Sequence, residues 1–586
     1  MPQFGTRNRP TWFVTAAVLA MAFAFRLMYG LSSPFWYEDE RQVYLIGLRS
    51  FARGLWPYFG ADVVWNGSQL GGALQAMLVR WPLAMWPAPE APIVFLNLLS
   101  FAALALLAWY FIRRFPDVPR WLIAGLLFTC PWTLNFSTHV INTSYILPGA
   151  IVFFVGFLEG MPAFRRGLVP LAAAWACMGF GLVWMMQIHM SWVVLPPFVL
   201  AAAIGLVTKT HSGSRFPNGL DWKTTPGVGF LAGAALPACL LVPTLLKYGI
   251  DSIGLTGAIT LQPQSPMGLL TTAARVLSFA SFEILRFLGL TRADRILTMW
   301  REPWLVPFGL VVLIAGIAQP LWMVATSFRR APAEKPTPGV GFRTQADWRN
   351  VRIFVAATIV LVYASYFLSI REQQAHAFYV VFPVSAFFAL SCWELAARTA
   401  GDRRKRWEKI SALVLLSNVV VHGGLAIDRL QRQSLYANRA LAAAAIADRN
   451  DRYLGDRRDT IYAMEDHRPR PVDPVADPDA YLAASPVADL EVQQVTWTPV
   501  FGLASAFSVT IQHRGTRAAW IDLRYLSSYK DASGREIETH QGVIKQIIQP
   551  GETRAWTVAD GNVPAQATTL TVAVTAAERV VPTRLR

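Results

Sequence analysis

The chain has 586 residues, of which 54% are hydrophobic and only 15% are charged. Soluble domains carry about a quarter charged residues, so this composition excludes an ordinary soluble protein and indicates a membrane protein. The formal net charge of +16 would suit a nucleic-acid partner, but much of the excess lies in short loops between apolar runs, where basic residues report membrane topology instead.

The chain contains four cysteines, and each of them lies in an apolar segment: Cys130, Cys177, Cys239 and Cys392. None lies in the polar C-terminal part, so the sequence excludes a disulfide framework and a Cys-x-x-Cys metal site. No spacing of His, Cys, Asp or Glu is typical of a metal site either. The sequence therefore indicates no resident cofactor, and only the involvement of a divalent metal stays open.

Apolar runs of about 17–25 residues, the length that crosses a bilayer, recur along residues 1–428. We expect about eleven transmembrane helices. The first run would also suit a cleaved signal peptide, since Ala20–Ala22 (AMA) resembles a cleavage site. An uncleaved helix is favoured because the run is long for a signal and many spans follow. The expected spans are 11–30, 93–112, 119–134, 145–160, 168–188, 191–208, 228–247, 303–326, 351–370, 377–396 and 410–427.

Basic residues are concentrated in alternate connections between these spans, whereas the other connections are poor in Lys and Arg or balanced by acids. By the positive-inside rule, the basic set and the N-terminus face the cytoplasm, and an odd number of spans leaves the C-terminus outside. The sequence thus predicts a multi-pass protein of the bacterial inner membrane. The basic connections contain Arg7 and Arg9; Arg113, Arg114 and Arg120; Arg165 and Arg166; Lys209, Arg215 and Lys223; Arg329, Arg330, Lys335 and Arg343; and Arg403, Arg404, Lys405 and Arg406.

Two of the outer connections are long, at about residues 31–92 and 248–302. The first contains the amphipathic, Trp-rich stretch GALQAMLVRWPLAMW, which suits a helix lying in the membrane interface. The second contains TTAARVLSFASFEILRFLGL, which has helical periodicity and sparse charge. Both connections are therefore expected to be largely helical and to lie on the outer surface of the membrane.

The composition changes after Asp428. Residues 429–487 predict a charged helical segment followed by a linker rich in Pro and Asp. Residues 488–586 predict a small all-β sandwich, because alternating patterns recur between turns at DASG and QPGE. This part holds no obvious catalytic set, so we interpret it as an extracytoplasmic packing or recognition module. Its expected strands are VQQVTWTPV, AFSVTIQH, AWIDLRYL, VIKQIIQ and TTLTVAVTA.

Three consecutive acids, Glu38, Asp39 and Glu40, follow the first span in the stretch FRLMYGLSSPFWYEDERQVYLIGLRSFARGLWPYFGADV. Acids at a helix end are often simply solvated. Here they belong to an ordered set: Arg26 near the end of the span, a Trp before the acids, Tyr44 after them, and then a Gly-x-Trp-Pro-Tyr stretch. The set indicates a polar site at the outer membrane–water boundary.

This set resembles the first external loop of the GT-C glycosyltransferases, in the branch of the protein O-mannosyltransferases and the lipid A aminoarabinose transferase. The family loop carries an Asp-Glu pair, matched here by Asp39 and Glu40, and then a membrane-parallel helix. The resemblance covers roughly residues 1–400 and implies a GT-C-like fold with Asp39 as the catalytic carboxylate. Several bacterial members continue with a Glu-Lys stretch near the substrate phosphate, whereas this chain has Val64–Ser68 there.

The resemblance implies an inverting transfer of a hexose or pentose from a polyprenyl-phosphate donor, without a nucleotide sugar. The acceptor would be a glycolipid, polysaccharide or protein of the cell envelope. An acceptor hydroxyl then needs an oriented base, and general-base help is worth ~10²–10⁴-fold. Since an Asp with an ordinary pKa of ~3.9 is a weak base, its placement matters as much as its basicity.

Other polar residues of the outer face are candidates for substrate binding. Arg371, His376 and Tyr379 precede the tenth span and are similar to the family's polar, aromatic segment near the lipid phosphate; the alternative is an interfacial anchor. His139 and His189 lie in outer turns, with Asn142 and Gln187 beside them in the sequence, and also suit structural polar groups. Asp62 and Glu302 are placed to support Asp39.

Two other classes of protein compete with the enzyme. A transporter or flippase of lipid-linked saccharides usually has ionisable residues at mid-span and internal repeats. Here Glu159, Lys247 and Glu394 lie near span ends, and we find no repeat. A non-enzymatic scaffold for envelope assembly would leave the three acids after the first span without a role. The sequence therefore favours the enzyme.

Overall fold

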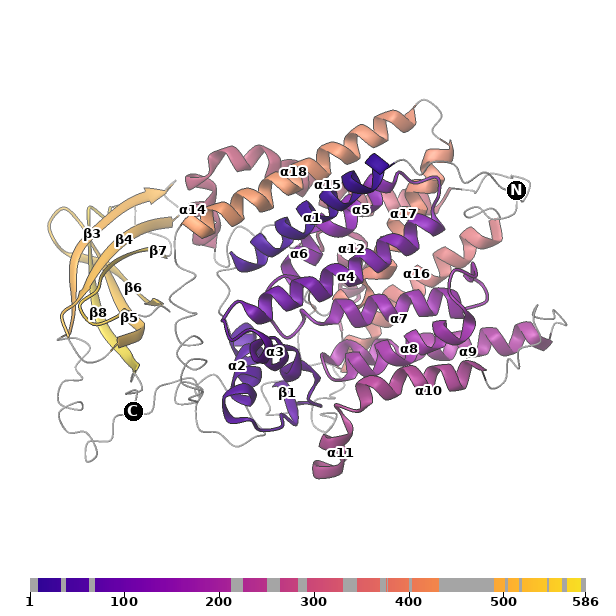
Figure 1. The fold of residues 1–586 in the computed structure, drawn as a ribbon. Helices are drawn as coiled ribbons and strands as arrows, with labels where there is room; N and C mark the ends of the chain where they lie inside the picture. Colours follow the sequence, from indigo (N-terminus) through magenta and orange to yellow (C-terminus); the bar gives the residue numbers. More distant parts are fainter. Residues whose placement is uncertain are drawn as a thin grey trace.

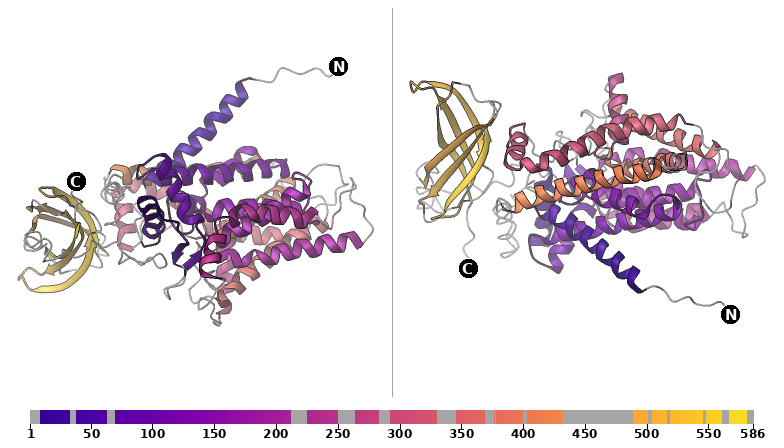
Figure 2. Two further views of the ribbon diagram at one scale, coloured as in Figure 1. Left: turned by 60° about the horizontal axis from the view of Figure 1, so that its bottom comes forward. Right: turned by 90° about the horizontal axis from the view of Figure 1, so that it is seen from above.

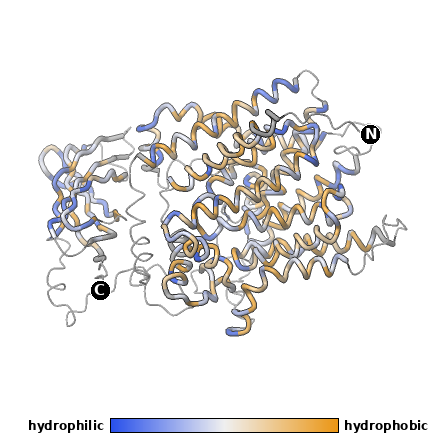
Figure 3. Tube along the Cα trace, viewed as in Figure 1, coloured by the Kyte–Doolittle hydropathy of each residue, from blue (hydrophilic) through white to orange (hydrophobic). Residues whose placement is uncertain are grey.

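The computed structural model shows a bundle of long helices with a small β-domain at one end (Figure 1). It describes residues 9–32, 38–62, 69–211, 225–249, 264–282, 292–329, 345–368, 376, 378–399, 403–431, 489–500, 504–515, 519–544, 548–560 and 566–580. Hydrophobic residues dominate the middle of the bundle helices, and hydrophilic residues gather towards their ends and in the β-domain (Figure 3).

The bundle helices follow the expected order along the chain. The first half contains α1 (Arg9–Leu31), α4 (Ala91–Arg114), α5 (Arg120–Thr129), α6 (Pro131–Ser137), α7 (Ile146–Gly160), α8 (Leu171–Met186), the 3-10 helix η1 (Met190–Val194) and α9 (Pro196–His211). The second half contains α10 (Thr225–Ala238), α11 (Val242–Tyr248), η3 (Pro303–Leu305), α15 (Val306–Ser327), α16 (Gln345–Ser365), η4 (Tyr366–Leu368), η5 (Tyr379–Val381), α17 (Phe382–Thr399) and α18 (Arg403–Gln431).

Seven helices of the described part are long and apolar enough to cross a membrane, and the bent pair α10–α11 adds an eighth candidate. Three further apolar helices, α5, α7 and α8, are shorter. Each expected span coincides with one of these helices, which confirms the mostly α-helical, polytopic fold. The count of eleven spans stays a prediction, because α5, α7 and α8 have only 10, 15 and 16 residues.

Prolines mark two breaks in the bundle. Cys130 has a non-helical ψ of 125° and separates α5 from α6, which begins at Pro131. α10 contains Pro237 and α11 begins with Pro243 near its first position, and the two helices meet at 70°. Proline lacks an N–H and clashes with the preceding turn, so the stretch 119–134 is two helices, where the sequence predicted a single span.

The first outer connection forms a compact unit. α2 (Glu38–Arg53) packs against α3 (Leu74–Met85), and between them β1 (Phe59–Asp62) pairs antiparallel with β2 (Gln69–Gly71). Figures 1 and 2 place α2, α3 and β1 at the same end of the bundle as the β-domain. We call this end the loop end. The opposite end, where α4 ends and α18 begins, is the basic end.

The second long connection is only partly helical as predicted. α12 (Pro266–Leu277) packs against α16, and α14 (Arg292–Arg301) packs against the β-domain. The periodic stretch from Thr271 onwards is not one helix, because α12 ends at Leu277 and both Ser281 and Phe282 have positive φ values of 48° and 57°. Residues 283–291 lie outside the described part of the chain.

The β-domain consists of two three-stranded antiparallel sheets, ordered β3-β4-β7 and β6-β5-β8. Apolar side chains from both sheets form one core that includes Phe507, Trp520 and Trp556. The expected strands in β3, β4, β5 and β8 are present, but β7 was not expected, and VIKQIIQ covers only the end of β6. The strands are β3 (Leu490–Val500), β4 (Ala504–His513), β5 (Ala519–Lys530), β6 (Glu536–Ile544), β7 (Thr553–Asp560) and β8 (Thr569–Val580).

Candidate active site

The three consecutive acids lie in the first turn of α2, at the loop end of the bundle (Figure 1). Asp39 and Glu40 are placed by their backbone, and their side chains lie outside the described part of the structure. Successive residues of an α-helix lie about 100° apart around its axis, so Asp39 and Glu40 occupy different faces of α2. Acids in a first turn also stabilise a helix start through its dipole, so this placement suits both a structural and a chemical role.

α2 is held firmly against its neighbours. Tyr44 is buried, and its hydroxyl donates a hydrogen bond to the carbonyl of Pro89 (2.8 Å). Arg80 of α3 donates to the hydroxyl of Ser50 (3.1 Å). α2 and α3 touch closely at Gly47, where an added Cβ would lie 2.3 Å from the Cβ of Val79. The acidic turn therefore belongs to a helix with a fixed position.

The hairpin after α2 is joined to the α6–α7 connection through Gln75. The Gln75 Oε1 accepts a hydrogen bond from the backbone N–H of Ala61 (2.8 Å), and its Nε2 donates to the carbonyl of Asn142 (3.3 Å). Asp62 ends β1 opposite Gln69, and its side chain lies outside the described part. The backbone that carries Asp62 is thus fixed, but no contact of its carboxylate is described.

A second attachment joins this unit to α8 and α10. The N–H of Ala73 donates to the carbonyl of Leu240 (2.9 Å), and Gln187 Nε2 donates to the carbonyl of Pro237 (2.8 Å). Gly72 has a φ of +113°, and an added Cβ there would lie 2.4 Å from Gln187 Oε1. Only glycine adopts this conformation readily, so Gly72 permits the close approach of the loop to α8.

Close to Gln187, an aromatic cluster brings together three of the predicted binding residues. His376 lies against His189 (6.1 Å between ring centroids) and Phe136 (6.4 Å), and Phe136 lies against Tyr379 (5.8 Å). We call these four residues the histidine–tyrosine cluster. Its members come from α6, the α8–η1 turn and the segment before α17, which are distant in the sequence.

His189 is partly buried within this cluster and has a defined hydrogen-bond partner. Its Nδ1 accepts the backbone N–H of Ser191 (3.1 Å), which caps the start of η1. A neutral ring therefore carries its proton on Nε2. Burial lowers the pKa of His189 to about 4, so the ring is neutral at pH 7 and offers a hydrogen-bond donor without a charge.

Arg26, which the sequence groups with the acids after the first span, has structural partners inside the bundle. It is fully buried near the end of α1, and its guanidinium donates to the carbonyl of Phe128 (3.0 Å), to Thr133 Oγ1 (3.1 Å) and to Ser137 Oγ (2.8 Å). These acceptors flank the break between α5 and α6. Arg26 thus satisfies backbone and hydroxyl oxygens that the break leaves available, and it lies near Tyr379.

The remaining candidates are placed as follows. His139 is buried in the α6–α7 connection, and Arg371 lies outside the described part of the chain. Glu302 accepts a hydrogen bond from Trp304 Nε1 (2.7 Å) and lies next to Asp428 of α18. The structure therefore gives Glu302 a local role at the start of η3, and no described contact links it to α2.

Among the described residues, no group of three or more His, Cys, Asp and Glu side chains lies close enough together to hold a metal ion. The side chains of Asp39, Glu40 and Asp62 fall outside that set. Binding of a divalent metal at the acidic turn therefore remains a prediction that is open from the sequence.

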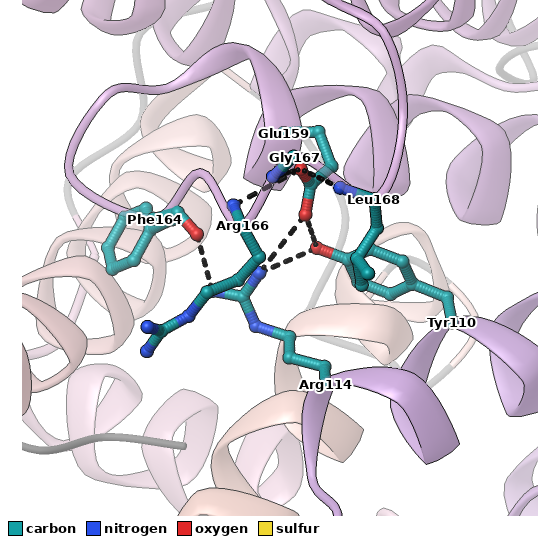
Figure 4. Close-up of polar contacts among 7 residues, drawn as sticks. All are labelled: Tyr110, Arg114, Glu159, Phe164, Arg166, Gly167 and Leu168. Carbon is teal, nitrogen blue, oxygen red and sulfur yellow. Dashed lines mark hydrogen bonds and ion pairs between the residues drawn. The ribbon is translucent and has the colours of Figure 1, made fainter. Parts of the chain in front are cut away.

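The acids at the basic end have structural partners. Glu159 is fully buried, and its Oε2 accepts the backbone N–H groups of Arg166 (3.2 Å), Gly167 (2.8 Å) and Leu168 (3.1 Å) (Figure 4). Its Oε1 accepts the Tyr110 hydroxyl (2.9 Å) and lies 3.4 Å from an Arg114 nitrogen, as Figure 4 also shows.

Glu394 is the second buried acid at this end. It pairs with Arg398 (3.0 Å), which also binds Asp117 (2.8 Å). These contacts hold the α4–α5 connection against α17, so both buried acids are part of the packing of the basic end.

Comparison with known proteins adds a fold-level similarity. No protein-family model and no curated protein sequence matches the chain at a significant level. Several solved structures are similar to the chain, at TM-scores below 0.5.

Three of these structures illustrate the extent of the similarity. ArnT from Cupriavidus metallidurans in the apo state has 13% identity and a TM-score of 0.43, with 82% of both chains covered. ArnT bound to undecaprenyl phosphate has 14% identity, a TM-score of 0.40 and the same coverage. The archaeal oligosaccharyltransferase AglB from Archaeoglobus fulgidus, in complex with an inhibitory peptide and a dolichol-phosphate, has 11% identity and a TM-score of 0.34, with 72% of this chain and 56% of that chain covered. Similarity at this level transfers no substrate and no residue role.

Proposed function

We propose that this chain is an inverting membrane glycosyltransferase that moves a sugar from a polyprenyl-phosphate donor to a cell-envelope acceptor. The observation that carries the proposal is the acidic first turn of α2. It lies at the loop end, directly after the first span, on a helix that Tyr44 and Arg80 hold in place. A fixed carboxylate at the depth where a lipid phosphate lies is what this transfer requires.

In this proposal Asp39 accepts the proton of the acceptor hydroxyl as that oxygen attacks the sugar. The bond between the sugar and the lipid phosphate breaks in the same displacement, and the phosphate leaves with the bond's electron pair. Glu40 lies on a different face of α2 from Asp39, so it has a separate task, such as orienting the donor or the acceptor. Glu38, which lies outside the Asp-Glu match, is assigned no step.

The histidine–tyrosine cluster, together with Arg371, His139 and Asp62, supplies the substrate-binding groups in this proposal. His189 is a neutral donor at pH 7, and neutral donors suit sugar hydroxyls because they do not have to lose a strongly bound hydration shell. The cluster lies near Gln187, which touches the first outer connection at Gly72. This adjacency supports a site shared between the loop and the bundle.

The same proposal sets the orientation of the chain in the membrane. The basic end faces the cytoplasm, and the loop end and the β-domain lie outside the bacterial inner membrane. Reporter fusions after Arg329 and after residue 586 test this topology. A fusion at the C-terminus that reports a cytoplasmic location would remove the proposed donor and acceptor from the site.

A transporter of lipid-linked saccharides is the alternative. Its usual sign is an ionisable residue that faces a path through the bundle. Glu159 and Glu394, the buried acids of the described bundle helices, are instead held by Arg114 and Arg398 at the basic end. This arrangement favours the enzyme.

The test is sugar transfer from a polyprenyl-phosphate donor by the purified protein, compared at equal amounts of folded material. Asn is nearly isosteric with Asp but does not accept a proton, so Asp39→Asn should reduce transfer at least ~10²-fold, as expected for a lost general base. Its unfolding temperature should stay unchanged. Glu38→Gln is the matched control, and it should have a mild effect.

Two results would change the assignment. If Asp39→Asn turns over normally while Glu40→Gln does not, the catalytic carboxylate is the next residue. If neither change reduces transfer, the acidic turn only stabilises the start of α2, and the glycosyltransferase proposal loses its main support.

A further inference from the structure

The cations at the basic end of the bundle fall into two groups. Three arginines that contact neighbouring helices have acidic partners: Arg114 pairs with Glu159 (3.4 Å), Arg398 with Asp117 (2.8 Å) and Arg404 with Glu408 (3.1 Å). Three cations of α18 differ, because Lys405, Arg406 and Lys409 are exposed and have no acidic partner among the residues that the structure describes. The start of α18 therefore carries positive charge that the described part of the chain does not balance.

The position of Lys405 and Arg406 adds no stability to α18 itself. The helix begins at Arg403, and its first turn contains no acid. A cation near a helix start is unfavourable, because it repels the positive end of the helix dipole. The three exposed cations are thus not explained by the fold of the described part, and their charge is available to an anion outside the chain.

The outer faces of α18 and α15 next to these cations are apolar. Helical residues three or four positions apart are neighbours, so Arg406 and Lys409 share one side of α18 with an exposed apolar row: Ile410, Leu413 and Leu416. α15 packs against α18 (Figures 1 and 2). It exposes a second row with the same spacing: Ile314, Ile317, Leu321 and Val324. Exposed apolar rows of a membrane protein face lipid chains, so the cations lie where a lipid-covered surface ends.

A pair of tryptophans joins the two helices beside these rows. The ring centroids of Trp322 on α15 and Trp407 on α18 lie 5.8 Å apart, and both side chains are partly buried. Tryptophan is enriched at the boundary between the acyl chains and the headgroups of a bilayer. The pair therefore marks the depth at which the apolar rows end and the cations of α18 begin.

The same pair shows that the two rows face one side of the bundle. The helices run antiparallel, because Leu305, just before α15, lies against Gly424 near the end of α18, whereas the tryptophans meet near the other end. Each tryptophan directly follows an exposed residue of its own helix, and successive helical residues lie about 100° apart. Contact between these two flanks of antiparallel helices turns both exposed rows outward to the same side.

We propose that Lys405, Arg406 and Lys409 bind the head of an anionic phospholipid, whose acyl chains lie along the exposed rows of α15 and α18. Cations without acidic partners favour a phospholipid with net negative charge over a zwitterionic one. A lipid is favoured over a soluble anion, because the apolar rows continue from the cations along the helices. The site lies at the opposite end of the bundle from the acidic turn of α2, so the inference goes beyond the proposed function and does not depend on it.

The test is native mass spectrometry of the full-length protein in neutral detergent, titrated with phosphatidylglycerol or with phosphatidylcholine of the same acyl chains. Each cation near an anionic lipid changes affinity roughly 5-fold. Arg406→Gln combined with Lys409→Gln should therefore weaken the tightest binding of phosphatidylglycerol roughly 25-fold. Arg406→Lys combined with Lys409→Arg keeps both charges and should bind nearly normally.

The matched control removes the same amount of charge elsewhere at the basic end. Arg113→Gln combined with Arg349→Gln replaces two exposed arginines, one on α4 and one on α16, and should leave the binding of phosphatidylglycerol unchanged. An equal loss of binding in both double variants would mean that the lipid responds only to the total charge of the basic end, and the inference would be wrong.

Two comparisons of ligands complete the test. The wild type should bind phosphatidylglycerol more tightly than phosphatidylcholine, and equal affinities would overturn the choice of an anionic head. Glycerol phosphate, which has the anionic group without acyl chains, should compete poorly with phosphatidylglycerol. Equal competition by glycerol phosphate would show that the apolar rows contribute nothing, and it would overturn a lipid as the occupant of the site.

Discussion

Charged residues close to the ends of apolar helices look alike in the sequence, but the two ends of the bundle hold them differently. At the basic end, Glu159 is enclosed by Arg114, Tyr110 and three backbone N–H groups (Figure 4). At the loop end, the acids belong to the first turn of α2, on a connection that uncharged groups such as Gln75 join to the bundle.

This difference gives a way to distinguish carboxylates that stabilise the fold from candidate catalytic carboxylates. A carboxylate whose oxygens are all used by helices and loops of the bundle stabilises the fold, and its removal should unfold the protein. A carboxylate on a separately anchored loop contributes less to the fold, and its removal should change activity instead. The predictions that follow test this division.

The largest effect on stability is expected at Glu159. Glu159→Gln leaves the Arg114 guanidinium buried without its carboxylate, and breaking a buried ion pair in this way costs about 3–5 kcal/mol. Thermal unfolding in detergent measures the loss. Glu408→Gln is the matched control, since its pair with Arg404 is partly exposed and such pairs contribute about 0–1 kcal/mol. A Glu159→Gln protein with normal stability and no sugar transfer would mean that Glu159 serves the reaction and not the fold.

The second prediction concerns the loss of stability that the titration of His189 causes at acidic pH. Its folded-state pKa of about 4 lies below the ordinary value of ~6.5, so the unfolded chain binds more protons between these two values. Protonation of His189 in the unfolded chain therefore leaves the free energy of unfolding unchanged above pH 6.5 and lowers it as the pH falls towards 4. At pH 5 this decrease is about 2 kcal/mol.

His189→Asn isolates this contribution, because Asn keeps an acceptor for the Ser191 N–H but does not titrate. Unfolding temperatures of the wild type and of the variant, compared at pH 7.5 and pH 5, should show a smaller acid-induced drop in the variant. Equal drops would mean that His189 is hydrated in the folded protein.

A smaller effect is expected at Gly72. Gly72→Ala places a Cβ against Gln187 at a φ of +113°, and strain of this kind costs about 1–3 kcal/mol. Gly54→Ala is the control, because Gly54 also has a positive φ (+69°) but nothing lies within 4 Å of its added Cβ. Limited proteolysis of residues 55–75 should accelerate more in Gly72→Ala. Equal rates would mean that the contact with Gln187 does not hold the loop.

Hydropathy predicted most of the bundle, because a helix in a membrane must be apolar over most of its length whatever its neighbours are. The exceptions are local. The break at Cys130–Pro131 falls inside an apolar run, so hydropathy predicts one span there although the proline marks the break. In the β-domain, β6 reads Glu-Ile-Glu-Thr-His and is largely exposed, so its sequence shows little of the alternation that predicts a strand.

The site was harder to predict than the fold. The acids after the first span were found because three charges in a row stand out beside an apolar helix. The contact between His189 and His376 was not predictable, because it joins segments that are far apart in the chain. From the sequence, Lys247 is only a basic residue near the end of a span. Its stacking on Tyr58 depends on the 70° bend between α10 and α11. No local sequence pattern predicts the angle of that bend.

The buried guanidinium of Arg26 has a consequence for how the protein is made. An arginine within a transmembrane helix opposes insertion by up to about 2.5–3.5 kcal/mol. Its acceptors, Phe128, Thr133 and Ser137, lie 102 to 111 residues further along the chain. During synthesis α1 therefore reaches the translocon long before its partners exist. We expect α1 to leave the protein-conducting channel only once α5 and α6 have emerged, so that the first helix of the chain is released into lipid after several helices that follow it in the sequence.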